Sequence, residues 1–180
     1  IFFHRVIDDF VIQAGDPTCT AVGAYPVSNP SCGSNGSDET IPFEADANLT
    51  HINGAVGMAR GLDPDSASSQ FYICDGSQHG LDNGNRSQED DPGYAVFGVV
   101  REGMDLVQAA AQVPTSNDPL NRPLYEVHIN SITLNGFVTL DVEEAKTEET
   151  QGIEFSLSLI ITLILLPIAV PGLLALIRRD

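Results

Sequence analysis

Short apolar runs separated by turn residues fill most of the chain up to residue 134. Runs of this length that are rich in Val, Ile, Phe and Tyr predict strands. Strands are expected at 2–7, 10–13, 54–59, 70–74, 94–100 and 125–134. One helix is expected at 103–112, where Met104, Val107 and Ala111 recur on one face and Pro114 follows. Many strands with little helix favour an antiparallel barrel or sandwich over a parallel nucleotide-binding fold.

The pattern changes after residue 137. Residues 138–154 carry six acidic residues against one lysine, and such a self-repelling composition is typical of an extended linker. Residues 155–177 form a run of 23 residues without a charge. A helix of that length crosses a bilayer, so we expect a transmembrane helix, with a buried core helix as the alternative. The expected organisation is a folded domain at 1–137, a linker at 138–154, the span at 155–177 and a short tail at 178–180.

Charges beside the span set its expected orientation. Arg178 and Arg179 follow it directly and acidic residues precede it, so the positive-inside rule places the C-terminus in the cytoplasm and residues 1–137 outside. An extracytoplasmic domain permits disulfides. Cys19 and Cys32 flank a loop-like segment and are candidates for one, whereas Cys74 lies in an apolar run. Three Asn-x-Ser/Thr sequons support this location weakly.

The chain is strongly acidic, with 25 acidic against 8 basic residues and a formal charge of −17. This charge repels nucleic acids and excludes them as partners. A high-salt source and ordinary surface solvation both fit such a composition. The spacing of the cysteines does not suggest a metal site, and we expect no metal or cofactor. The chain opens at Ile1 without a native start, so we interpret the N-terminus as truncated.

Several motifs occur in a fixed order along the domain. They are FHRVI at 3–7, FVIQAGD at 10–16, GMAR at 57–60, SSQFYI at 68–73, LD at 81–82 and YAVFGVVREGMD at 94–105. Together they resemble the signatures of the cyclophilin-type peptidyl-prolyl cis/trans isomerases, and the bacterial and archaeal branch most closely. The resemblance implies a mainly β fold, an antiparallel β-barrel with few helices, whose first two strands and first helix are absent here.

The resemblance also implies a function. The chain is expected to be a peptidyl-prolyl cis/trans isomerase that assists the folding of exported or membrane proteins, with Xaa-Pro segments as substrates and the membrane as a partner through its helix. Two alternatives stay open: a non-catalytic cyclophilin-like scaffold or chaperone that binds peptides, and a purely structural membrane protein. Rotation about the prolyl bond faces a barrier of about 18–20 kcal/mol from amide resonance, and no nucleophile is needed to lower it.

Catalysis requires a donor aimed at the prolyl amide, and Arg5 is the candidate, against the alternative of a salt bridge to Asp8 or Asp9. Gln13 resembles the glutamine that holds the substrate backbone. The other residues that match the family's substrate site are Phe10, Val11, Tyr72 and Leu81 in its proline pocket, Ala59 on the groove wall, Gln70 nearby and Tyr94 at the position of a pocket histidine.

The chain departs from the family pattern at three places. Gly80 stands where many eukaryotic members carry a tryptophan, so tight cyclosporin binding is not expected. Two insertions, at 83–93 and 18–40, flank the expected site. The second contains Cys19 and Cys32, and it is either a gate for substrates or an inert surface loop.

Overall fold

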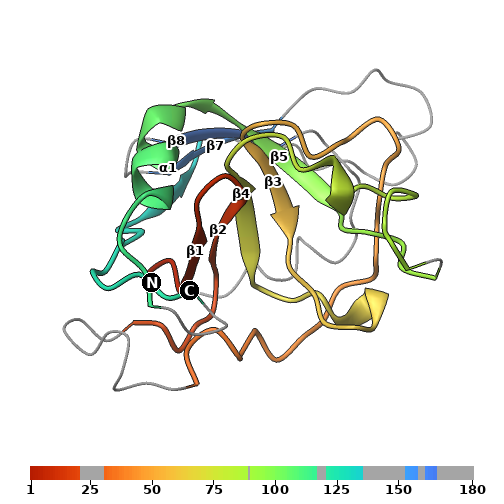
Figure 1. Ribbon diagram of the computed structural model, residues 1–180, viewed down its shortest axis with the longest axis horizontal. Helices are drawn as coiled ribbons and strands as arrows, with labels where there is room; N and C mark the ends of the chain where they lie inside the picture. Colours follow the sequence, from red (N-terminus) through yellow and green to blue (C-terminus); the bar gives the residue numbers. More distant parts are fainter. Residues whose placement is uncertain (21–30, 89, 117–120, 136–152, 158–160, 166–180) are drawn as a thin grey trace.

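The structure is a computed structural model that describes residues 1–20, 31–88, 90–116, 121–135, 153–157 and 161–165. Its strands form one antiparallel sheet in the order β1-β2-β4-β3-β5-β8-β7-β6 (Figure 1). The strands are β1 (Arg5–Ile7), β2 (Val11–Ala14), β3 (Ala55–Met58), β4 (Phe71–Cys74), β5 (Val96–Glu102), β6 (Ile132–Leu134), β7 (Ile153–Leu157) and β8 (Ile161–Leu165). The helix α1 (Met104–Ala111) and two 3-10 turns, Pro64–Ser66 and His79–Leu81, complete the described elements.

Both faces of the sheet are buried around β2 and β4. Successive side chains of a strand point to opposite faces, so each strand contributes to two clusters. Ile12 and Ile73 are paired across β2 and β4 and belong to one core cluster, which includes Val107 and Ala111 of α1. Val11, Tyr72 and Cys74 belong to a second cluster, whose members alternate with those of the first along β2 and β4. The second face carries the candidate site.

The helix α1 covers the first face. It begins after Gly103, whose φ of 79° lies in the left-handed region that glycine adopts without strain. Val107 and Ala111 are its buried residues, and Met104 packs against the same cluster. The helix contacts β1 and β2, beside which Figure 1 draws it. The expected helix at 103–112 is therefore present with nearly the same bounds.

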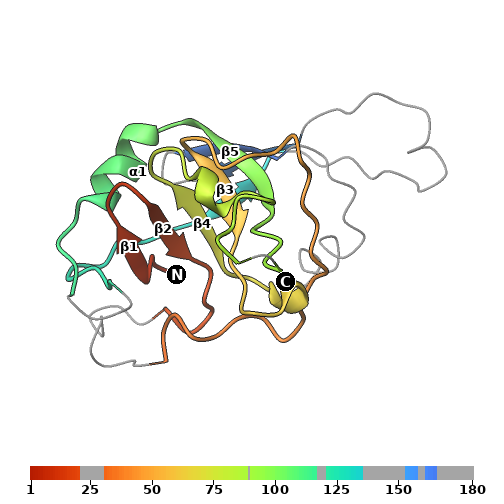
Figure 2. The same ribbon diagram turned by 45° about the vertical axis from the view of Figure 1, so that its right-hand side comes forward.

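The strands match the hydrophobic pattern best in the centre of the sheet. β2, β3 and β4 each lie within one residue of the expected bounds, and Figure 2 shows them side by side with β1. The expected strand at 125–134 is shorter than predicted, because only Ile132–Leu134 forms a strand and His128 makes an isolated bridge with Phe2. The two end strands of the described sheet, β1 and β6, are thus only three residues long.

The expected closed barrel is not what the structure shows. Closure would require a ladder between the end strands, β1 and β6. The strand pairings of the described residues contain no such ladder. Only a short contact joins the segments beside these strands: Phe3 N donates to Val127 O at 3.0 Å and Ile129 N donates to Ile1 O at 2.9 Å. The fold is mainly β with few helices, but its sheet is open.

The C-terminal segment also differs from its expected form. Residues 155–157 and 161–165 belong to strands β7 and β8, which pair with each other, and β8 also pairs with β5. A short apolar run suits a strand as well as a helix, and hydropathy alone does not distinguish them. Across the described ranges, no helix has the length and apolar character to cross a bilayer. The rest of the expected span, the linker at 138–152 and the tail at 178–180 lie outside the described residues.

Candidate functional site

Arg5, Gln13 and Tyr72 form a row across three neighbouring strands. Arg5 of β1 pairs with Gln13 of β2, and Gln13 pairs with Tyr72 of β4. Directly opposed residues of antiparallel strands project to the same face, so this register gathers the three side chains. Gly57 of β3 continues the row, and a Cβ there would lie 2.4 Å from Tyr72 Cζ. Glycine at position 57 therefore makes room for the tyrosine ring.

The Arg5 guanidinium makes few interactions with other described residues of the protein. Its one hydrogen bond to a described residue is a long one, from Nη1 to Gln13 Oε1 at 3.5 Å. Its Cζ lies 5.8 Å from the centroid of the Phe10 ring, within the range of a cation–π contact. No described carboxylate forms an ion pair with it. Partial burial lowers the pKa of Arg5, yet arginine stays cationic in proteins.

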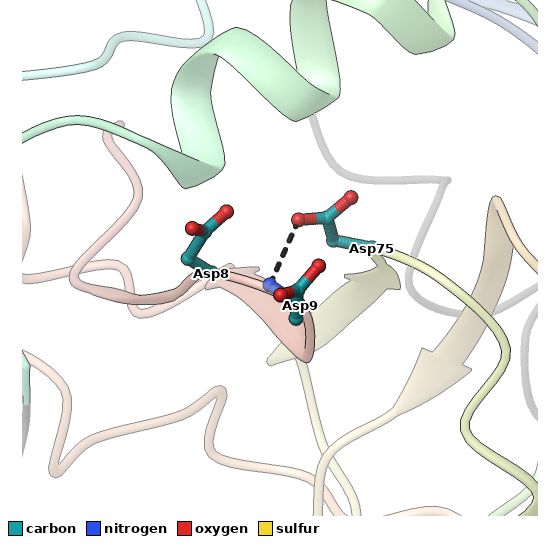
Figure 3. Close-up of side chains that lie close together, drawn as sticks. All are labelled: Asp8, Asp9 and Asp75. Carbon is teal, nitrogen blue, oxygen red and sulfur yellow. Dashed lines mark hydrogen bonds between the residues drawn. The ribbon is translucent and has the colours of Figure 1, made fainter.

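The alternative salt bridge from Arg5 to Asp8 or Asp9 is not formed. These two aspartates lie in the turn between β1 and β2, close to Asp75, which directly follows β4 (Figure 3). Asp9 N donates to Asp75 Oδ2 at 3.1 Å. Burial, together with the two neighbouring carboxylates, raises the pKa of Asp75 despite this bond. The three carboxylates have the spacing of metal ligands, but two are exposed and nothing beside them indicates a ligand.

An apolar cluster lies next to Arg5. Val11 and Tyr72 are buried in it, and the partly buried residues packed against it include Phe10, Ala59, Leu81 and Tyr94. The Tyr72 and Tyr94 rings meet edge to face with centroids 6.1 Å apart. All six apolar residues that the family resemblance assigned to the substrate site thus lie in one cluster. Gln70 is the polar residue that the resemblance assigned to the substrate site, and its Oε1 accepts a hydrogen bond from Gln13 Nε2 at 2.7 Å.

The Tyr72 hydroxyl is the first member of a buried chain of hydrogen bonds. Its hydroxyl lies 2.6 Å from His51 Nε2, and His51 Nδ1 lies 2.6 Å from Asp82 Oδ1. Burial raises the pKa of Tyr72, which keeps the hydroxyl protonated. Burial lowers the pKa of His51, so its ring is neutral. The phenol therefore donates to Nε2, and Nδ1–H donates to the Asp82 carboxylate.

Asp82 collects three hydrogen bonds. The backbone N of His51 donates to it at 2.7 Å and the His79 ring contacts its other oxygen at 2.8 Å, in addition to the bond with the His51 ring. Burial alone would raise the pKa of this carboxyl, but these bonds outweigh burial and hold it below its ordinary value. Asp82 thus stays ionised and fixes the tautomer of His51.

The Tyr94 ring makes cation–π contacts with two arginines. The Arg60 Cζ lies 4.7 Å and the Arg86 Cζ 5.3 Å from its ring centroid. Asp91, within the 83–93 insertion, forms ion pairs with both arginines. The hydrogen bond from Arg86, with those from Gly93 and Arg60, lowers the pKa of Asp91 to about 2. The insertion therefore fixes an aromatic ring of the candidate site.

The other insertion is fastened beside Gln70. A disulfide joins Cys19 and Cys32, the pair proposed from the sequence. Gln70 Nε2 donates to the backbone oxygens of Gly33 at 3.2 Å and Asn35 at 2.6 Å. Asp16, fully buried, accepts hydrogen bonds from the backbone N of both these residues. The segment next to the disulfide is thereby part of the site's surroundings.

Sequence reasoning did not assign roles to His51, Asp82 and Asp91. Asp82 was visible only as the second residue of the LD motif, and His51 carried no motif at all. Each of them has a partner 21 to 31 residues away along the chain: Tyr72 and Asp82 for His51, and Arg60 for Asp91. Contacts of that separation follow from strand order and cannot be read from local spacing.

Comparisons with known proteins point to one family. A family model described as "Cyclophilin type peptidyl-prolyl cis-trans isomerase/CLD" matches residues 1–134. A peptidyl-prolyl cis-trans isomerase of Acinetobacter baylyi is 37% identical over 142 residues, which cover 76% of this chain and 66% of that protein. Peptidyl-prolyl cis-trans isomerase A of Dickeya dadantii is 37% identical over 115 residues, or 64% of this chain and 53% of that protein. The chain thus spans between about half and two thirds of these relatives.

Animal and structural relatives extend the comparison. The human peptidyl-prolyl cis-trans isomerase-like 3 is 35% identical over 134 residues, covering 74% of this chain and 71% of that protein. The crystal structure of a Cryptosporidium parvum cyclophilin type peptidyl-prolyl cis-trans isomerase, determined in the presence of the dipeptide Ala-Pro, superposes with a TM-score of 0.50. It is 25% identical, over 69% of this chain and 68% of that one.

Proposed function

The chain belongs to the cyclophilin-type peptidyl-prolyl cis-trans isomerase family, and we propose that it catalyses prolyl isomerisation with Arg5 as the catalytic residue. The observation that carries this proposal is the state of Arg5. Its guanidinium stands beside an apolar cluster, makes one long hydrogen bond to Gln13, and has no ion pair with a described carboxylate. Donors of this cation therefore stay free for a substrate.

The chemistry follows from the electronic structure of the amide. In the planar form the nitrogen lone pair is delocalised into the carbonyl, and this resonance produces the rotational barrier. As the bond twists, the lone pair localises on the nitrogen and becomes a hydrogen-bond acceptor. A guanidinium N–H aimed at that nitrogen stabilises the twisted state more than either planar state, which accelerates rotation. No covalent bond forms or breaks, so no proton changes hands.

The substrate class follows from the apolar cluster and from a relative. Phe10 and Leu81 are partly exposed and pack against the buried Val11 and Tyr72, and together they form an apolar environment that suits a pyrrolidine ring. The Cryptosporidium relative was crystallised with Ala-Pro. We assign Xaa-Pro segments of polypeptides to this chain, with the proline against the cluster and its amide nitrogen toward Arg5. Gln13 completes the site as the residue beside Arg5 that engages the substrate backbone.

The test is prolyl isomerisation of an Ala-Pro peptide by the full chain, compared with Arg5→Ala and Arg5→Lys. Removing one positioned donor of this type costs about 10²- to 10³-fold in rate. We expect that loss in kcat/KM for Arg5→Ala. Lysine keeps the charge but not the planar array of donors, so Arg5→Lys is expected to recover only a small part of the activity. Peptide affinity should change much less than the rate.

The same experiment distinguishes catalysis from a binding scaffold. A folded wild type that binds the peptide without accelerating isomerisation would support the non-catalytic peptide-binding alternative. A folded wild type that neither binds nor accelerates would leave a purely structural role. Equal rates for wild type and Arg5→Ala would show that catalysis, if present, does not depend on this cation.

We further propose that residues 1–137 work outside the cytoplasm, on exported or membrane proteins. The Cys19–Cys32 disulfide supports this location because disulfides persist in oxidising compartments. Anchoring by residues 155–177 rests on their uncharged length alone. A membrane helix there and strands β7 and β8 are mutually exclusive. Alkaline extraction of membranes from expressing cells tests the anchor: retention in the pellet supports it, and release into the supernatant excludes it.

A further inference from the structure

The side-chain amide of Gln70 lies between the candidate site and the segment 31–35. Its Nε2 donates to Gly33 O at 3.2 Å and to Asn35 O at 2.6 Å. Its Oε1 accepts from Gln13 Nε2 at 2.7 Å. Gln13 in turn presents Oε1 to Arg5. One continuous series of hydrogen bonds therefore runs from the segment 31–35 to the guanidinium.

The direction of this series is fixed by chemistry. Backbone carbonyls only accept hydrogen bonds, so the Gln70 NH₂ group must face Gly33 and Asn35. Gln70 Oε1 is then left to face Gln13, which can meet it only with Nε2. If Gln70 were reversed, two carbonyls would lose their donor and Gln13 would turn its own NH₂ group toward the Arg5 cation. Two carbonyl groups thus determine that an oxygen faces Arg5.

Asp16 holds these carbonyls in place. It is fully buried, and its Oδ2 accepts from Gly33 N at 2.6 Å and Asn35 N at 2.9 Å. Its Oδ1 accepts from the N and Oγ1 of Thr18, both at 2.7 Å. Burial alone would raise the pKa of Asp16, but these four bonds outweigh it and lower the pKa, so the group is a carboxylate. One buried anion therefore binds both the start of the insertion and its segment 31–35.

Two further features hold the segment 31–35 in position. The disulfide from Cys32 to Cys19 ties it to the chain that leaves β2, and both cysteines are buried. Gly33 has a φ of 93°, and a Cβ there would lie 2.9 Å from His4 Cδ2. A larger residue would thus be both strained and crowded. The backbone at Gly33 is fixed by contacts on several sides.

We propose that Asp16, Gln70 and the segment 31–35 form a positioning element for catalysis, which orients Gln13 so that its oxygen holds the Arg5 guanidinium toward the substrate. This inference rests on the proposed isomerase function and deepens it. The only hydrogen bond of the guanidinium to a described side chain goes to Gln13, so these groups act through Gln13 and are not catalytic residues. The segment 31–35, which the disulfide ties to Cys19, is thereby a working part of the site.

The kinetic test is a double-mutant cycle in the full chain with Gln70→Met and Gln13→Ala. Methionine keeps the length of the side chain and lacks both the Oε1 acceptor and the Nε2 donor of Gln70. Loss of one such hydrogen bond corresponds to about a fivefold to tenfold fall in kcat/KM, which we expect for Gln70→Met alone, mostly in kcat. In the Gln13→Ala background the same substitution should change kcat/KM less than about twofold, because its effect passes through Gln13. Equal effects in both backgrounds would overturn the proposal.

A structural measurement keeps this inference separate from the proposed function. In ¹⁵N-labelled protein, the Gln13 side-chain NH₂ signals should be dispersed in the wild type and move toward random-coil values in Cys19→Ser/Cys32→Ser. Val107→Ala on α1 is the control, because it weakens the core without touching the series. An unchanged Gln13 signal in the double serine variant would refute the positioning element. An inactive wild type with the expected signals would refute only the isomerase function.

Discussion

At the scale of single residues, Tyr72 combines a ring buried in the apolar cluster next to Arg5 with a hydroxyl that is hydrogen-bonded to His51. The hydroxyl makes a 2.6 Å hydrogen bond with His51, which is itself fully buried. The bond fixes the tilt of the ring, and Gly57 leaves the space that the ring occupies. The buried His51 ring thus orients the Tyr72 ring within the apolar cluster.

Tyr72→Phe should destabilise the protein by about 1–3 kcal/mol. The ring is retained, but His51 Nε2 becomes a buried acceptor without a donor, and that loss costs more than a solvated hydrogen bond. The matched control is Tyr94→Phe, because the Tyr94 hydroxyl makes no hydrogen bond to the described residues; its effect should stay within about 0.5 kcal/mol. Urea unfolding measures both. Equal stabilities of the two variants would show that the Tyr72–His51 bond contributes nothing.

His4 is a second residue with a defined energetic consequence. It is buried, and neither ring nitrogen has a hydrogen-bond partner among the described residues. Burial outweighs the attraction of Asp16 and lowers the pKa of His4 from 6.5 to about 4. Below pH 6.5 the unfolded chain takes up a proton that the folded protein does not, so stability falls as the pH drops toward 4.

The His4→Phe variant tests this pH dependence. Between pH 7 and pH 4 the wild type should lose about 3 kcal/mol more stability than the variant, since each pKa unit corresponds to about 1.4 kcal/mol. The other titrating groups are common to both proteins, so the difference isolates His4. The measurement is urea unfolding at several pH values. Parallel stability curves for the two proteins would contradict the neutral, buried state of His4.

At the scale of elements, strand order explains how the site is assembled. β1, β2 and β4 are neighbours, and their register sets Arg5, Gln13 and Tyr72 in one row. Described parts of the two insertions then support residues next to this row. One fixes Tyr94 through Asp91, and the other fixes Gln70 through the carbonyls of Gly33 and Asn35. Irregular segments thus supply the supports and the regular strands supply the functional row.

Strand β8 offers a test at this scale. Ile164 pairs with Val99 of β5 on one side and with Glu154 of β7 on the other. Ile164→Pro removes a backbone donor from a strand that is paired on both edges, so we expect a loss of more than about 2 kcal/mol. Ile164→Val is the control, because it keeps the donor and the β-branched side chain. Unchanged urea unfolding of the proline variant would show that these residues do not belong to the sheet.

At the scale of the whole molecule, some features could be predicted from the sequence and others could not. Arg5 and Gln13 lie in motifs within one short stretch, so the family resemblance could point to both of them, and the register of β1 and β2 pairs them. The central strands and α1 could be predicted from the spacing of apolar residues along the chain. The chain from Tyr72 through His51 to Asp82 depends on contacts between distant segments, and no local pattern encodes it. The uncharged run after residue 154 leaves two interpretations open, because its whole length suits a membrane helix and its short apolar segments suit paired strands.

Charge also acts at this scale. The molecule carries a formal charge of −17, yet the candidate site is built around Arg5, with Arg60 and Arg86 close to Tyr94. The latter two are neutralised in part by Asp91, whereas Arg5 has no such partner among the described carboxylates. The site is thus a local exception to an acidic protein. That exception is what the proposed chemistry requires.

The most direct measurement is exchange NMR of an Ala-Pro peptide at cis/trans equilibrium, with a catalytic amount of the full chain. Uncatalysed exchange takes about 10–100 s at 25 °C, too slow for cross-peaks between the two isomers. The account predicts such cross-peaks with the wild type and their loss with Arg5→Ala, while both proteins still bind the peptide. Absence of cross-peaks with a folded, peptide-binding wild type would contradict the central claim.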